Sequence, residues 1–283
     1  MSLFKIHANT PALTSLDSLY RSSEEIAIHQ ARLASGKRIN TAKDDSAGYA
    51  IARSLQQRAQ GLRGALANVR NARSILSIAE GGYQAQMDVL LTIKSKTVQA
   101  ADSSLNDEQR TAVRNQVKEL LTEVDDISSQ AKWNGENIFG STFSFHVGAD
   151  KDDKLPVVLS SSDSSAVGGD TLADLSSMGE TGGTYSIEDE TKSALAIGAV
   201  DTAIQALATV IQGIGDTIIR LGLKADALSI TAANTEATRS RYEDADMAQE
   251  QMEFLKHQIV QQTGISALSQ ANSAPQIVLS LFR

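Results

Sequence analysis

Apolar residues recur at alternating spacings of four and three along the last third of the chain, and this pattern constrains the fold more than any other feature. It keeps a heptad period for more than four heptads and predicts one helix of about 33 residues, or ~50 Å, with a narrow apolar stripe. Such a stripe is typical of a coiled coil, and an amphipathic helix on an ordinary globule is the alternative. The stripe consists of Val200, Ile204, Leu207, Ile211, Ile214, Ile218, Leu221, Ala225, Leu228 and Ala232.

Two further stripes predict partners for this helix. One recurs every seven residues from Leu55 to Leu90, and a shorter one covers 113–127. The polar run 102–107 between them is typical of a turn with a helix cap. We therefore expect an antiparallel helical hairpin on which the later helix packs. The predicted coiled-coil packing residues are Leu55, Leu62, Val69, Leu76, Val200, Ile204, Leu207, Ile211, Ile214, Ile218 and Leu221.

Apolar stripes also predict a helix at each end of the chain. An isolated amphipathic helix of this polarity is marginal in water, so neither end segment is expected to bury its stripe alone. The N-terminal stripe includes Leu13, Leu16, Tyr20, Ile26 and Leu33, and the C-terminal one includes Ala248, Met252, Leu255, Ile259 and Gln262.

A break separates the N-terminal helix from the next one. The first helix is expected to end at Ser35-Gly36, because glycine readily adopts the left-handed conformation of a helix C-cap. The polar run 40–45 follows and ends in Asp44 and Asp45. These two carboxylates are expected to cap the positive end of the following helix.

The helical period disappears over 134–192, where Gly, Ser and Asp accumulate. Thr142–Val147 alternates with period two, and Leu155–Leu159 is the expected return strand of a β-hairpin. Residues 160–165 are expected to form a solvated loop, and the acidic middle of the chain is expected to face water. The predicted fold class is mainly α and rod-shaped, with long antiparallel coiled-coil helices from both chain ends and a small β-hairpin insertion.

Composition restricts the possible functions. The chain has no cysteine and therefore no disulfide, thiol nucleophile or thiolate metal site. Its net charge of -8 argues against a general nucleic-acid binder. We find no run of about 18 apolar residues, and the start of the chain lacks a long apolar stretch and a small-residue cleavage site. Neither membrane insertion nor a cleaved signal peptide is therefore expected.

No pattern points to catalysis or to a bound metal. The four histidines, His7, His29, His146 and His257, show no ligand spacing, and the motif His-Glu-x-x-His does not occur. Paired carboxylates such as Asp44-Asp45 are better explained as helix caps than as an acid and a base. We therefore predict no enzymatic activity, no catalytic residue, no cofactor and no metal.

One basic face is predicted on the second helix. It is expected to be a solvated or intersubunit surface, with Glu243 and Glu250 as candidate partners, and each exposed pair would add only about 0 to 1 kcal/mol. The face consists of Arg53, Arg58, Arg63, Arg70 and Arg73.

Stretches near both ends resemble the signatures of bacterial flagellins. Residues 32–52 read RLASGKRINTAKDDSAGYAIA and resemble the N-terminal signature. Residues 240–248 read SRYEDADMA and, together with 261–283, resemble the C-terminal one. The resemblance covers roughly 1–150 and 193–283.

The resemblance implies a division of the chain into inner-core and outer-core parts. In flagellins the first and last helices form the inner core around the export channel, and the next helices with a β-hairpin form the outer core. Longer members insert exposed domains in the middle, where this chain has only about 40 residues, so it resembles a core-only flagellin. The expected domains are 1–43 (N-terminal inner-core helix), 44–138 (two outer-core helices), 139–192 (β-hairpin and short acidic variable loop), 193–238 (C-terminal outer-core helix) and 239–283 (C-terminal inner-core helix).

The function implied is that of a structural subunit of the extracellular flagellar filament, which propels swimming. In the family the subunit is exported unfolded through the flagellar type III channel and polymerises beneath a cap into a helical tube. The implied partners are further copies of the chain, other flagellins, an export chaperone, the filament cap and the hook-filament junction proteins. A hook-filament junction protein, which shares the two-ended helical plan, is the alternative. The expected polymerisation residues are Leu13, Leu16, Ile26, Leu33, Met252, Leu255, Ile259, Leu279, Leu281 and Phe282.

The resemblance also marks a segment that animal innate receptors recognise in many flagellins. That segment is of the type Arg-x-Arg-Glu-Leu, and here an Arg and the Glu are replaced. We therefore expect weak receptor activation. The equivalent residues are Thr92, Ile93, Lys94, Ser95 and Lys96.

Overall fold

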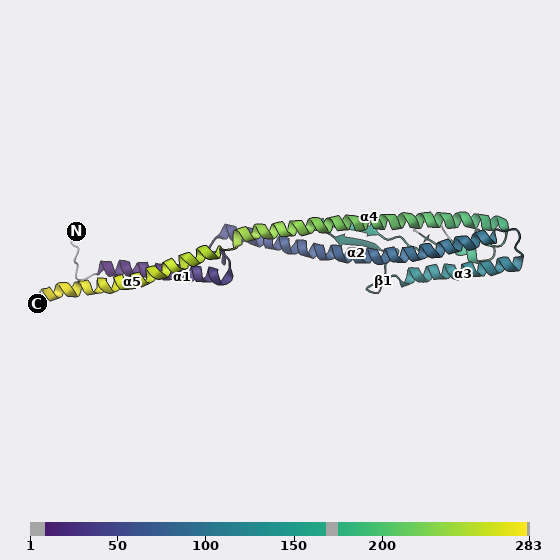
Figure 1. Ribbon diagram of the computed structural model, residues 1–283. Helices are drawn as coiled ribbons and strands as arrows, with labels where there is room; N and C mark the ends of the chain where they lie inside the picture. The colour runs from purple at the N-terminus through teal and green to yellow at the C-terminus, as the bar shows by residue number, and fades with distance from the viewer. Residues whose placement is uncertain (1–8, 168–174, 282–283) are drawn as a thin grey trace. The chain divides into compact units, whose positions relative to one another are not determined.

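The computed structural model describes residues 9–167 and 175–281, with side chains described as far as Ser273 at the C-terminal end. The described chain is dominated by long α-helices, with two small β-hairpins between the third and fourth of them (Figure 1). The predicted mainly-α class with a small β insertion is therefore confirmed. The helices are α1 (Thr10–Ser35), α2 (Ser46–Ala100), α3 (Asp107–Gln130), α4 (Glu190–Glu243) and α5 (Met247–Leu281); the strands are β1 (Lys132–Trp133), β2 (Glu136–Asn137), β3 (Thr142–His146) and β4 (Lys154–Val158), and a short 3-10 helix, η3, covers Ser176–Gly179.

The chain divides into two compact units. The terminal unit comprises Met1–Ala59 with Ala233–Arg283, and the central unit comprises Gln60–Ala232. The helices α2 and α4 each contribute to both units. The two units are described separately below.

The central unit is organised around one apolar core between α2, α3 and α4. The Nζ atom of Lys94 lies 2.5 Å from Oδ1 of Asp201, which pairs α2 with α4. Burial of one large aliphatic side chain stabilises a fold by about 1.5–3 kcal/mol, so this core supplies the main stabilisation of the unit. Of the predicted packing residues in this unit, Leu62, Val69, Leu76, Val200, Leu207, Ile214 and Leu221 are buried in the core, and Ile204, Ile211 and Ile218 pack against it partly buried.

The turn between α2 and α3 carries a capping box. The side chain of Asn106 accepts from the backbone N–H of Gln109 at 2.8 Å, and the Gln109 side chain accepts from the N–H of Asn106 at 3.1 Å. Both otherwise unpaired N–H groups at the start of α3 are satisfied in this way. The predicted turn with a helix cap is confirmed.

The β-hairpin of β3 and β4 closes one side of the core. The strands pair antiparallel, with Thr142 opposite Val158 and His146 opposite Lys154. On its inner face Val157 is buried, and Val147 and Leu159 are buried just beyond the strands. The predicted hairpin is confirmed.

A second, tighter hairpin joins β1 to β2 and was not predicted. Its two turn residues, Asn134 and Gly135, have φ of 51° and 88°. These left-handed values are typical of the type I′ turn that Asn-Gly favours. The dipeptide was therefore a usable signal in the sequence.

The acidic middle of the chain is less solvated than its composition predicts. Ser162 is 0% exposed, and its hydroxyl bonds to Oε1 of Gln86 in the core. The expected solvated loop over 160–165 is therefore wrong at this position, because the buried Gln86 amide needs polar partners. The expectation that the middle faces water is also wrong for five apolar residues that reach full burial: Leu159, Val167, Leu175, Met178 and Ile187.

The helix α4 is longer and more apolar than predicted. By length and composition alone it contains an 18-residue window apolar enough to cross a membrane, so the expectation that no such run exists is wrong. The reason is that Ala and Gly, with few charged residues, fill the positions between the heptad residues. Core helices of soluble proteins pass the same test. Only 28% of that window is buried inside the chain. That the chain does not insert into membranes stays a prediction.

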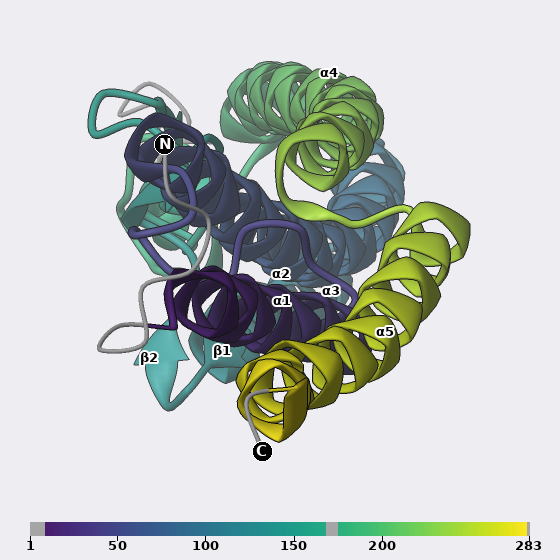
Figure 2. The ribbon, with the colours of Figure 1, turned by 90° about the vertical axis from the view of Figure 1, so that its left-hand side faces the viewer.

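The terminal unit pairs α1 with α5 in antiparallel orientation (Figure 2). The side chain of Asn9 donates to the carbonyl of Ala271 at 2.9 Å, and the hydroxyl of Ser22 donates to the carbonyl of His257 at 2.9 Å. Residues early in α1 thus meet residues late in α5. The helix α1 ends as predicted, with Gly36 in the left-handed region at φ 70°.

The two aspartates in the loop between α1 and α2 have different roles. Asp45 caps α2, because its Oδ1 accepts from the N–H of Gly48 at 2.9 Å. Asp44 instead accepts from the N–H groups of Asn40 and Thr41 at 3.0 and 2.8 Å and so closes the loop. These hydrogen bonds, that from Thr41 foremost, lower the pKa of Asp44. The prediction that both residues cap the helix is wrong for Asp44.

Candidate assembly surface

The contact between α1 and α5 contains several polar groups. Besides the bonds of Asn9 and Ser22, Nε2 of Gln261 donates to Oγ of Ser23 at 3.1 Å. Nδ1 of His29 lies 2.5 Å from a carboxylate oxygen of Glu250. Among the described side chains of the two helices, the buried ones are polar: Ser22, His29 and Glu250.

Large apolar side chains of the same two helices face outward. Met252 and Ile259 are 64% and 63% exposed, and Leu13 is 60% exposed. Large exposed apolar patches on soluble proteins usually mark an interaction site. The other exposed apolar residues on α1 and α5 are Tyr20, Met247, Leu255, Val260 and Ile265.

The predicted polymerisation residues therefore fall into three groups. Leu13, Met252, Leu255 and Ile259 are exposed, and Leu16, Ile26 and Leu33 are partly buried. The side chains of Leu279 and Leu281 lie outside the described ones, and Phe282 lies outside the described residues. Their role in polymerisation stays a prediction.

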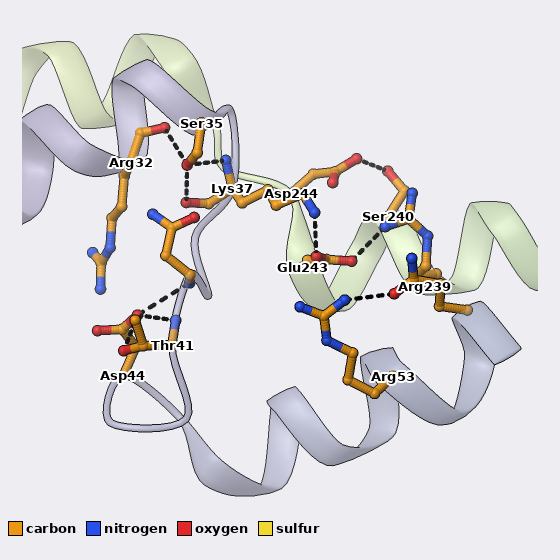
Figure 3. A network of polar contacts seen from close by, with 12 residues as sticks. Arg32, Ser35, Lys37, Thr41, Asp44, Arg53, Arg239, Ser240, Glu243 and Asp244 are labelled. Carbon is orange, nitrogen blue, oxygen red and sulfur yellow. Dashed lines mark hydrogen bonds and ion pairs between the residues drawn. The ribbon is translucent and has the colours of Figure 1, made fainter.

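The turns that flank this helix pair are held together by Glu243, the last residue of α4 (Figure 3). Its carboxylate lies 2.6 Å from Nζ of Lys37 and also pairs with Arg239, which in turn lies 2.6 Å from Glu236. Glu243 is 5% exposed. Burial by itself raises the pKa of this carboxyl, but the hydrogen bonds from Lys37 and Arg239 outweigh it and lower the pKa.

Backbone pairing joins the same two turns. The N–H of Arg38 donates to the carbonyl of Glu243 at 2.7 Å, and the N–H of Ala245 donates to the carbonyl of Gly36 at 3.0 Å. Lys37 and Asp244 form an isolated antiparallel bridge between these bonds. We refer to residues 36–39 and 243–245 together as the junction. Parts of the two signature stretches, far apart in the sequence, therefore meet here.

The basic face of α2 does not use the acidic partners expected for it. Glu243 pairs with Lys37 and Arg239, and Glu250 contacts His29 and Arg32 inside the same subunit. The expectation that these two carboxylates serve the basic face is therefore wrong. The five arginines of that face are exposed, and the guanidinium of Arg53 lies 4.8 Å from the centroid of the Tyr49 ring.

The possible receptor segment lies on α2 in the central unit. Ile93 is fully buried, and Lys94 is held by Asp201. Thr92 and Ser95 are exposed, and Lys96 is partly buried. The weak receptor activation expected from the sequence stays a prediction.

The central unit carries exposed apolar residues that the heptad analysis missed. Ile219 and Leu223 on α4 are 63% and 67% exposed. They lie beside the heptad positions, so a search for one narrow stripe passes over them. A count of apolar residues outside the stripe could have found them. The others in the central unit's helices are Ile78, Leu91, Val98, Leu195 and Ile230.

Comparison with known proteins agrees with this picture over nearly the whole chain. The family model of the bacterial flagellin N-terminal helical region matches residues 6–144, and that of the C-terminal helical region matches residues 197–282. The flagellar filament 33 kDa core protein of Treponema phagedenis is 31% identical over 291 aligned positions, which cover 98% of this chain and 99% of that protein. Flagellin FlaB2 of Treponema pallidum is 32% identical with the same coverage.

A solved structure supports the fold alone. A candidate flagellar hook-associated protein from Vibrio parahaemolyticus superimposes with a TM-score of 0.58 at 13% identity, covering 71% of this chain and 100% of that chain. At this identity the likeness carries no functional argument.

The long helices and the exposed apolar residues of α1, α4 and α5 define a helical structural protein with surfaces available to partners. Within that class, the chain belongs to the bacterial flagellins. It is a structural subunit of the flagellar filament, an extracellular appendage that serves motility.

Proposed function

We propose that the exposed apolar side chains of α1 and α5 are the surface through which this subunit polymerises. The observation that carries the proposal is the burial pattern of α1 and α5. The buried side chains described for the two helices are polar, whereas the apolar side chains of Met252, Ile259 and Leu13 are exposed. Burying one large apolar side chain contributes about 1.5–3 kcal/mol. Several such side chains together can offset the cost of association, about 4–15 kcal/mol.

A repeated heterologous contact of this kind generates an open helix instead of a closed ring. The surface and its partner patch are then used once by every subunit along the filament. The exposed residues on α4 of the central unit, such as Ile219 and Leu223, provide a second patch for lateral neighbours.

The domain plan forms part of the same proposal. Residues 1–43 and 239–283 form the inner core, and 44–138 with 193–238 form the helices of the outer core. The hairpin and the short middle segment, 139–192, occupy the position at which longer flagellins carry further domains.

Export and assembly partners are also proposed. The subunit passes unfolded through the flagellar export channel with a dedicated chaperone, and a filament cap and the hook-filament junction proteins guide its assembly, together with any co-assembling flagellins. No N-terminal segment is cleaved, and the subunit has no enzymatic activity. The mass of the subunit recovered from filaments tests the absence of cleavage.

Deletion of 248–283 tests the assembly surface. We expect a soluble monomer that no longer polymerises, while the central unit keeps its cooperative unfolding in urea, because its core lies within Gln60–Ala232. Normal filaments from the truncated chain would refute the proposal.

Electron microscopy after seeding with filament fragments separates the filament subunit from a hook-filament junction protein. Long tubular filaments from the intact chain are expected. Persistent monomers or short oligomers of limited length would instead favour the junction protein.

A further inference from the structure

The contact between α1 and α5 brings together three side chains of the types that bind metal ions. Glu25 and His29 lie one turn apart on α1, and His257 faces them from α5. One ligand atom of each lies within 4.8 Å of the other two. His29 is buried, His257 is partly buried and Glu25 is exposed, so the cluster has one fixed ligand and a side open to solvent.

Glu250 fixes the orientation of the His29 ring. Its Oε2 lies 2.5 Å from Nδ1 of His29, and its Oε1 lies 3.4 Å from a guanidinium nitrogen of Arg32. A proton on Nδ1 is therefore donated to Glu250, which leaves the lone pair of Nε2 on the other side of the ring. Metal-binding histidines usually have such a carboxylate behind them, which holds the ring and raises its basicity.

On the open side of the ring, the described residues offer Nε2 of His29 no hydrogen-bond donor. Nε2 of His29 faces Oε2 of Glu25 at 4.0 Å, and with the proton on Nδ1 both of these atoms are hydrogen-bond acceptors. The second imidazole, His257, stacks on His29 with 5.5 Å between ring centroids. Nε2 of His257 lies 3.9 Å from a carboxylate oxygen of Glu253, which already pairs with Lys256 at 2.9 Å. A cation bound among these acceptors would satisfy them.

We propose that Glu25, His29 and His257 bind a divalent transition metal, for which Zn²⁺ is the best match. Two imidazoles and one carboxylate form a common Zn²⁺ ligand set, whereas Mg²⁺ and Ca²⁺ prefer sites built from oxygen alone. Ligand atoms about 2.0–2.2 Å from Zn²⁺ lie about 3.4 Å from each other in a tetrahedral site. Small side-chain rotations close the cluster to that spacing, and water completes the fourth position.

The bound metal cross-links α1 to α5 in a helix pair whose buried side chains, among those described, are polar. The site thus joins the first and last helices of the subunit near the middle of their contact. The inference is independent of which surface carries polymerisation, because all of its ligands lie in the contact within one subunit.

The test measures Zn²⁺ binding to the full-length chain after removal of metal with a chelator, on the monomer and on filaments assembled from it. Calorimetry is expected to show one Zn²⁺ per chain in at least one of these forms. Co²⁺, used as a spectroscopic substitute, is expected to give the visible absorption bands of a nitrogen- and oxygen-ligated site.

Two variants remove one ligand each and leave the contact between His29 and Glu250 intact. These variants, His257→Asn and Glu25→Gln, are each expected to weaken Zn²⁺ affinity at least about 10-fold. A third variant, Glu250→Gln, keeps all three ligands but alters the orientation of His29, and it is expected to weaken the affinity about 10–100-fold. His146→Asn, on β3 in the central unit, is the matched control and is expected to leave the affinity unchanged. Circular dichroism of the metal-free variants shows whether helix content is kept.

The proposal is overturned if neither form of the chain binds a stoichiometric Zn²⁺. It is equally overturned if the double variant of His257→Asn with Glu25→Gln binds as the parent does, or if His146→Asn abolishes binding. A Co²⁺ spectrum that disappears in the double variant and persists in His146→Asn establishes the site.

Discussion

The two units of the chain are both built on long antiparallel helices, yet they are held together by different forces. The central unit has a core of fully buried apolar side chains, such as Leu76, Leu90 and Leu207. In the terminal unit the described apolar residues that reach full burial are Ile39, Ala52 and Ala59, and all three lie outside α1 and α5. In the terminal helix pair the buried side chains that the structure describes are polar, and apolar side chains such as Leu16 and Leu33 are only partly buried.

This difference separates folding from assembly within one chain. A long helix pair without an apolar core is marginal in water, whereas a unit with its own core folds cooperatively. The central unit is therefore expected to fold before assembly. The terminal unit is expected to gain most of its stability when neighbouring subunits cover its apolar surface.

The largest expected effect comes from the core of the central unit, where α2 offers two adjacent leucines. Leu90 is 0% exposed and Leu91 is 51% exposed. Leu90→Ala removes a buried side chain and is expected to lower the free energy of unfolding by about 2–5 kcal/mol. Leu91→Ala, with the same chemical change, is expected to alter it by less than about 0.5 kcal/mol. Urea unfolding of the monomer measures both changes in the free energy of unfolding, and equal changes would contradict the described core.

A smaller effect is expected at the junction of the terminal unit. Glu243→Gln leaves Lys37 and Arg239 without their shared carboxylate, and we expect the local opening free energy to fall by about 1–3 kcal/mol. Hydrogen exchange of the Arg38 and Ala245 amides, which bond across the junction, measures this opening. Asp17→Asn removes an exposed pair with Arg21 in the same unit and is the control expected to change little.

The junction is also expected to open in acid. The pKa of Glu243 is lowered from its usual value of 4.5 in the folded chain. Its contribution to stability is therefore complete above about pH 4.5 and is lost as the pH falls through the lower folded value. The protection factors of the junction amides, which are exchange rates corrected for the intrinsic pH dependence of amide exchange, should fall over that interval in the parent chain. Glu243→Gln should lose this pH dependence, and an unchanged profile would exclude Glu243 as its cause.

Removal of a helix N-cap should lower the free energy of global unfolding more in the central unit than in the terminal unit. Asn106→Ala removes the cap of α3 and is expected to lower the free energy of global unfolding by about 1 kcal/mol. Asn9→Ala removes the cap of α1, whose side chain accepts from Ala12 and donates to Ala271. Because we expect the terminal pair to open before the core unfolds, Asn9→Ala should leave the midpoint in urea almost unchanged. A shift as large as that of Asn106→Ala would place both units in one cooperative transition.

The sequence predicted the core positions that follow from a local repeat, and it missed the contacts between residues far apart in the chain. Heptad spacing selects Leu76 and Val200, because a seven-residue repeat keeps one face of a helix turned towards its neighbour. No local rule shows that Ser162 will meet Gln86 or that His29 will meet His257. Those contacts arise only when segments far apart in the chain pack together, so a loop expected in water contains a buried serine and scattered histidines form a cluster.

The substitution with the smallest expected effect on monomer stability, Ile259→Ser, should have the largest effect on assembly. Ile259 is 63% exposed on α5, so Ile259→Ser removes an apolar surface that solvent already covers and should change monomer stability by less than about 0.5 kcal/mol. In the filament the same change would remove about 1.5–3 kcal/mol of apolar burial, which corresponds to a critical concentration for polymerisation higher by roughly 10-fold or more. Sedimentation of seeded assemblies measures that concentration. Gln258→Ser, the exposed polar neighbour, is the control, and an equal rise in both variants would mean that the helix and not its apolar surface had been damaged.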